Sequence, residues 1–180
     1  KKKKKLGGII YPVFGHWAWT SHFTGKAPGW LESLGFRDFS GSTVVHSLGA
    51  WAALASIMII GPRIGKFDKQ SGSKKLKGHN LTLATTGVFI LWMGWFGFNG
   101  GSEFGFTSHV PQIFINTFLA SACGAITMLV WQFYQKKQIE IENILNGLLA
   151  GLVASSASCD AVSPAASVVI GIIAAIFFFF

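Results

Sequence analysis

The sequence has few of the residues on which soluble enzymes and small disulfide-stabilised domains depend. Only two of its 180 residues are cysteines, Cys123 and Cys159, and both lie in or beside apolar runs without metal-type spacing. We expect them to be packing residues, so neither a disulfide framework nor a metal site is predicted. No P-loop, nucleophile elbow or pair of catalytic carboxylates is present. The sequence therefore indicates neither an enzyme nor a cofactor.

Charge is scarce as well, at 12% of the residues, which is about half of the share in a soluble domain. Hydrophobic residues make up 51%, with 17 Phe and 7 Trp, as expected for lipid-facing surfaces and interfacial belts. The net charge of +8 does not indicate a nucleic-acid partner, because the basic residues cluster in short loops between apolar runs. We predict an all-α integral membrane protein, a polytopic helical bundle in a lipid bilayer. The expected spans are residues 6–19, 39–60, 81–102, 111–134, 144–159 and 165–180.

The second of these runs, residues 39–60, carries a histidine at membrane depth. It has 22 residues without a formal charge, which as a helix would reach roughly 33 Å, enough to cross a bilayer core of about 30 Å. Its many Gly, Ala and Ser residues favour close contact with other helices. His46 lies about eight residues from its start. Either its neutral ring bonds a neighbouring helix, or it lines a path for a small solute.

The distribution of Lys and Arg predicts the orientation. Of the 15 basic residues, 13 lie in residues 1–5, 61–80 and 135–142, which alternate spans place on one side. Only Lys26 and Arg37 remain for the other side. Basic loops face the cytoplasm, so the loops at 20–38, 103–110 and 160–164 are predicted to face outward.

Polar and aromatic groups gather near the outward ends of these spans. Trp95 and Phe98 offer aromatic faces, over which a cation gains about 0.5–2 kcal/mol, and Ser102 offers a hydroxyl. An interfacial aromatic belt is the alternative interpretation. Asp38 directly precedes the histidine run, where a carboxylate can cap the helix. Two further acids, Glu103 and Asp160, are expected to be exposed in loops.

Four ordered segments resemble the ammonium transporter (Amt/Rh) family. They are DFSGSTVVHSLGAWAAL followed by GPR, then HNLTLATTGVFILWMGWFGFNGGS, then NTFLASACGAITMLVW, and then NGLLAGLVASSASCDAVSP. The resemblance implies a homotrimeric fold of eleven helices with inverted repeats, of which residues 1–180 would supply roughly the fourth to ninth. It also implies a plasma membrane location, the inner membrane in a bacterium.

The resemblance assigns roles to six residues. His46 would be the first of two pore histidines, and Trp95 and Phe98 would line the pore with it. An outer ammonium site would include Trp19 and Ser102, and Asp38 would be a structural acid near the entrance. The second pore histidine of the family has no counterpart in this sequence.

The implied function is transport of ammonium, which would be recruited outside and deprotonated so that ammonia crosses a hydrophobic pore. The alternative is an ammonium sensor that uses the same fold to signal to a cytoplasmic domain. Altered residues around His46 leave the sensor open, since SGST stands for AGGT and His-Ser-Leu-Gly for His-Ile-Asn-Ala. A further departure from the family pattern is CDAV for Cys-Gly-Tyr-Val. The loop at 20–38 is also longer than in many bacterial members.

Overall fold

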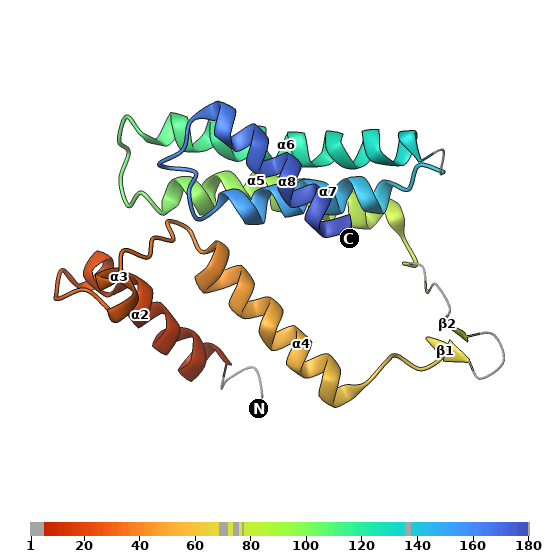
Figure 1. The fold of residues 1–180 in the computed structure, drawn as a ribbon, viewed down its shortest axis with the longest axis horizontal. Coiled ribbons are helices and arrows are strands. Elements are labelled where there is room, and N and C mark those ends of the chain that lie inside the picture. The colour runs from red at the N-terminus through yellow and green to blue at the C-terminus, as the bar shows by residue number, and fades with distance from the viewer. Residues whose placement is uncertain (1–5, 69–71, 74–75, 77, 136–137, 180) are drawn as a thin grey trace.

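The computed structural model describes residues 6–68, 72–73, 76, 78–135 and 138–179. Its elements in chain order are η1 (Leu6–Ile10), α2 (Tyr11–Thr24), α3 (Trp30–Ser33), η2 (Ser42–Ser47), α4 (Leu48–Ile60), β1 (Phe67–Asp68), β2 (Gly72–Ser73), α5 (Leu81–Gly101), α6 (Val110–Tyr134), α7 (Ile141–Ser155) and α8 (Pro164–Phe179). Helices α5 to α8 form one bundle, and α2, α3 and α4 lie along one side of it (Figure 1). Of the 13 basic residues on the predicted cytoplasmic side, only Arg63 and Lys66 lie within the described residues.

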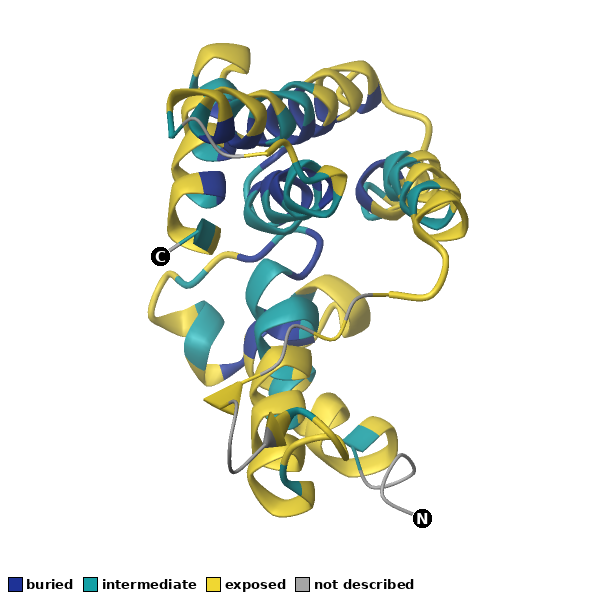
Figure 2. Cartoon of the chain, turned by 90° about the vertical axis from the view of Figure 1, so that its right-hand side faces the viewer, coloured by how far each residue is buried: buried dark blue, intermediate teal, exposed yellow. Residues whose placement is uncertain are grey.

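The packing core lies where α6, α7 and α8 meet, and Figure 2 shows the buried positions gathered on these helices. Small residues allow this contact. A methyl group added at Gly124 would collide with the carbonyl oxygen of Gly147, and one at Gly151 or Gly171 would collide with that of Ala120. Backbones that approach so closely gain dispersion contacts, which drive helix association where lipid is as apolar as the side chains.

Each apolar run predicted as a span overlaps a helix, although the run at 39–60 becomes helical only at Ser42 and the run at 144–159 leaves helix α7 at Ser155. The all-α membrane fold expected from the sequence is confirmed. Among the described residues, three helical stretches are long and apolar enough to cross a bilayer: Ser42–Ile60, Leu81–Gly101 and Val110–Tyr134. Helices α7 and α8 are shorter apolar helices. That they also cross stays a prediction.

The loop expected at 20–38 is more ordered than the sequence indicated. Helix α2 continues to Thr24 and ends at Gly25, whose φ is 63° and whose N–H donates to the carbonyl oxygen of Ser21. The hydroxyls of Thr20 and Thr24 donate to carbonyl oxygens four residues back, so these polar side chains are satisfied within the helix. The loop then holds the short helix α3. In the basic loop at 61–80, β1 and β2 pair as a small antiparallel hairpin that the helical pattern did not predict.

Candidate functional site

Three of the predicted site residues form one aromatic cluster. The ring of His46 stacks on that of Trp95, with centroids 5.0 Å apart and planes 25° apart. Phe98 lies 5.6 Å from His46 and 5.8 Å from Trp95. The cluster lines a cavity of about 420 Å³, completed by Ile90, Leu91 and Gly94. Residues from two helices therefore present one polar ring to an otherwise apolar space.

His46 lies in the π-helical turn η2, and the Nε2 atom of the His46 ring is buried. In the described part of the chain this atom has no hydrogen-bond partner. The Nε2 atom therefore gives no support to the interpretation that the His46 ring bonds a neighbouring helix. A π-turn places one extra residue in the helical ladder and is frequent at functional sites.

Asp38 is a buried cap on the helix that carries His46. Its Oδ1 accepts a hydrogen bond from the N–H of Gly41 at 2.7 Å, and its Oδ2 accepts from Thr43 and Val44 at 2.8 and 2.9 Å. Asp38 as a whole is only 3% exposed. Gly41 has φ 108°, and a methyl there would collide with Val45, so only glycine suits this turn. The cap is the one that the sequence indicated, whereas a role for Asp38 at an entrance stays a prediction.

Trp19 lies at a second cavity, called the outer cavity below because the loop predicted to face outward lines it; the cavity beside His46 is called the inner cavity. Its indole Nε1 donates a hydrogen bond to the carbonyl oxygen of Asp38. The cavity has a volume of about 570 Å³, and its lining includes Trp19, His22, Asp38 and Glu103. Ser102 does not line it; its hydroxyl donates to the carbonyl oxygen of Phe98 at 2.9 Å. The structure therefore does not bring Trp19 and Ser102 to one cavity, and their joint role in an ammonium site stays a prediction.

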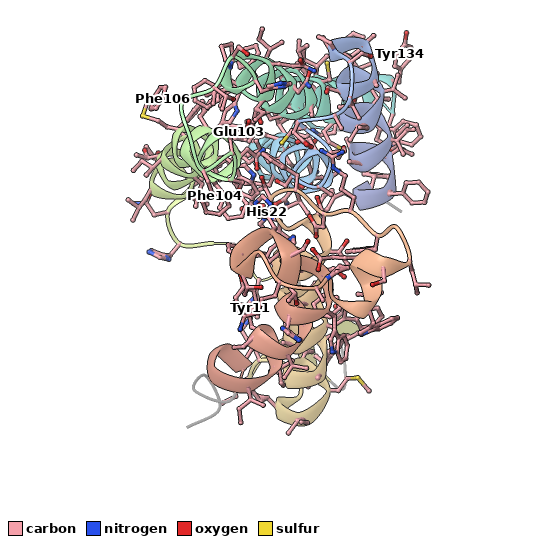
Figure 3. The ribbon with its side chains drawn as sticks, turned by 90° about the vertical axis from the view of Figure 1, so that its left-hand side faces the viewer. Tyr11, His22, Glu103, Phe104, Phe106 and Tyr134 are labelled. Atoms are coloured by element: carbon pink, nitrogen blue, oxygen red, sulfur yellow. The ribbon has the colours of Figure 1, made fainter. Side chains whose placement is uncertain are left out.

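A ring contact joins the end of α2 to the loop after α5. His22 lies 5.2 Å from Phe104, and Figure 3 shows His22, Phe104 and Glu103 together on this face. Glu103 accepts a hydrogen bond from the hydroxyl of Thr107 at 2.8 Å and is half-buried rather than exposed. The sequence did not single out His22, because a histidine at a helix end carries no motif of its own.

The expectation that Asp160 is an exposed loop acid is wrong. Its side chain is 10% exposed and forms an ion pair with Arg37, which is 66% exposed. A carboxylate so close to full burial needs a partner, and Arg37 supplies it. The two residues are 123 positions apart. No local pattern could have predicted that they meet.

Glu32 connects α3 to α2. Its carboxylate accepts hydrogen bonds from the hydroxyl and N–H of Ser21, at 2.7 and 3.2 Å, and from the N–H of Gly29 at 2.6 Å. Burial raises the pKa of Glu32, but these hydrogen bonds outweigh it, so the pKa lies below its ordinary value. The carboxylate is therefore charged at neutral pH, on the wall of the outer cavity.

Comparisons with known proteins identify the family of this chain. The family model described as Ammonium Transporter Family matches residues 5–180. The chain belongs to the ammonium transporter family. The relatives include a putative ammonium transporter of Synechocystis sp., 49% identical over 168 residues that cover 91% of this chain and 31% of that protein. Ammonium transporter Amt2 of Archaeoglobus fulgidus is 42% identical over 182 residues, which cover 94% of this chain and 37% of the relative.

Solved structures of the family share the fold. A structure named Sensor Amt Protein superposes with a TM-score of 0.90 and 45% identity, over 94% of this chain and 42% of that chain. Mep2 of Candida albicans superposes with a TM-score of 0.81 and 33% identity, over 94% and 36%. This transporter-family chain is thus a multi-pass membrane protein and not an enzyme, as predicted. It spans about a third of the length of the curated relatives named above.

Proposed function

We propose that the full protein moves ammonium across the membrane and that residues 1–180 supply part of its path. The stacked cluster of His46, Trp95 and Phe98 on apolar helices is the observation that carries this proposal. Bare ammonium loses its hydration at membrane depth at a cost of several kcal/mol, which apolar walls do not return. Neutral ammonia avoids most of that cost, so ammonium must release its proton before ammonia passes. The proton then crosses the membrane separately, so that each ammonia molecule is accompanied by one positive charge and transport gives a current.

In this mechanism the outer cavity holds the cation and the inner cavity admits the neutral molecule. Carboxylates of Glu32 and Glu103 and the indole face of Trp19 favour a positive charge in the outer cavity. Beyond it, His46 offers one donor and one acceptor in an apolar wall. Asp38 holds the turn that carries this ring. We propose a homotrimer in a plasma membrane, the inner membrane in a bacterium.

Flux measured in liposomes tests the proposal. The full-length protein should carry an ammonium current that saturates with ammonium concentration and exceeds the current in protein-free liposomes. Potassium at the same concentration should carry little. A protein that is folded and correctly inserted but passes neither ammonium nor ammonia would overturn transport.

A sensor is the second candidate, because the structure named Sensor Amt Protein superposes closely, with 45% identity. In a sensor, the same cavities would bind ammonium, and a cytoplasmic domain would read the bound state. Ammonium binding by calorimetry, without any flux, would favour this candidate over the transporter.

The orientation predicted from the basic residues has its own test. In a full-length protein without native cysteines, an impermeant maleimide added outside should label Lys26→Cys, because Lys26 is exposed in the outer loop. It should not label Arg63→Cys in the basic loop until the membrane is permeabilised. Labelling in the reverse order would show that the topology is inverted.

A further inference from the structure

The end of α7 holds the segment that leads to His46. The hydroxyl of Ser42 donates to the carbonyl oxygen of Val153 at 2.5 Å and accepts from the N–H of Ala157 at 2.7 Å. The N–H groups of Phe39 and Ser40 donate to the carbonyl oxygens of Ala157 and Ser156, at 3.0 and 2.8 Å. Residues 153–157, at the end of α7 and just after it, are called the 153–157 turn below. Their hydrogen bonds fix the backbone that leads into the π-turn η2 and the first residue of that turn.

The same turn also holds the ring on which His46 stacks. Trp95 Nε1 donates a hydrogen bond to the hydroxyl of Ser156 at 2.9 Å, and that hydroxyl donates to the carbonyl oxygen of Leu152 at 2.8 Å. Ser156 is fully buried. Its hydroxyl is therefore fixed in direction by Leu152, with a lone pair free for the indole.

We propose that Ser156 is a positioning residue that sets the plane of the Trp95 indole against His46. The proposal rests on the transport function proposed above. Ser156 does not line the inner cavity, and among its described contacts its hydroxyl reaches that cavity only through the ring of Trp95. An indole has a single N–H donor, and leaving it unpaired in an apolar surrounding carries a desolvation penalty. Without Ser156 the indole would turn toward another acceptor, and the 25° stack with His46 would be lost.

The neighbouring residue supplies a matched control. Ser155 is also fully buried, and its hydroxyl also donates to the carbonyl oxygen of Leu152, at 3.1 Å. The described contacts of its hydroxyl do not include Trp95. Ser155→Ala and Ser156→Ala therefore remove the same group from the same helix end, and only the second removes the partner of the indole.

The first measurement is spectroscopic and does not depend on transport. Full-length protein labelled with 5-fluorotryptophan is compared with a Trp95→Phe variant to assign the Trp95 resonance. We expect Ser156→Ala to shift or broaden that resonance in the ¹⁹F spectrum and Ser155→Ala to leave it in place. An unchanged Trp95 resonance in Ser156→Ala would overturn the positioning role.

The second measurement is the ratio of ammonium to potassium current in liposomes at equal folded protein. Ser156→Ala should lower this ratio by about two- to tenfold, the factor that corresponds to one hydrogen bond, and Ser155→Ala should not. In a Trp95→Phe background, Ser156→Ala should have no further effect, because the donor is already absent. Equal losses in both serine variants, or a further loss in the double variant, would show a merely structural role. Absence of any wild-type current would overturn the transport proposal, and the ¹⁹F result would still decide the position of the indole.

Discussion

Replacing His46 by asparagine should leave the yield of folded protein nearly normal and remove the discrimination between ammonium and potassium. Asparagine keeps a polar side chain but has no ring nitrogen that can accept a proton, and it does not fill the face that stacks on Trp95 at 5.0 Å. The apolar barrier beside the inner cavity would then admit a hydrated cation. We expect the ratio of ammonium to potassium current to fall at least about tenfold, which is ~1.4 kcal/mol.

The measurement uses full-length wild type and variant in liposomes at equal reconstituted protein. His109→Asn is the control, since His109 is exposed before α6 and lies outside the described contacts of the cluster. It should behave as wild type. If the His46 variant keeps both its ammonium current and its exclusion of potassium, His46 does not line the path. If it loses all current without admitting potassium, the ring is needed for passage itself rather than for exclusion.

The helices were predictable because the composition of a segment is enough to indicate a membrane span. Runs of about twenty uncharged residues have few other stable forms, since backbone groups must be satisfied internally in lipid. The capping role of Asp38 was predictable because the residue stands just before the histidine helix, and its oxygens accept from three N–H groups there. The helix itself begins at Ser42 rather than at residue 39, because the chain first passes through Gly41 at a φ of 108°. The end of α2 was missed because Thr20, Ser21 and His22 are polar, although polar residues can extend a helix beyond the apolar core.

Contacts between distant positions were not predictable from residue patterns. His46 and Trp95 belong to different helices, and only their resemblance to family motifs suggested that both line one path. The bonds from Trp95 to Ser156 and from Arg37 to Asp160 join residues 61 and 123 positions apart. Serines in a small-residue helix end look like packing residues, so a hydroxyl that positions an indole leaves no signal in one sequence.

The buried cap supplies the second large effect: Asp38→Ala should destabilise the full-length protein more than Asp38→Asn. Alanine leaves the N–H groups of Gly41, Thr43 and Val44 without their acceptor in a site that is only 3% exposed. We expect a loss of about 2 kcal/mol or more, at the upper end for a cap, because these N–H groups are shielded from water. Asparagine keeps one acceptor oxygen but turns an NH₂ toward N–H groups, so it should recover only part of the loss.

An exposed cap on another helix calibrates this expectation. Asn80 begins α5, and its Oδ1 accepts a single hydrogen bond, from the N–H of Leu83 at 2.8 Å. Asn80→Ala should therefore cost less, about 1 kcal/mol. Thermal unfolding midpoints of the detergent-solubilised protein, followed by size exclusion, should fall in the order wild type, Asn80→Ala, Asp38→Asn and Asp38→Ala. Ammonium current per folded protein is measured alongside. If Asp38→Asn folds as well as wild type but carries as little current as Asp38→Ala, the negative charge itself acts on the cation at the outer cavity, and capping is not its main role.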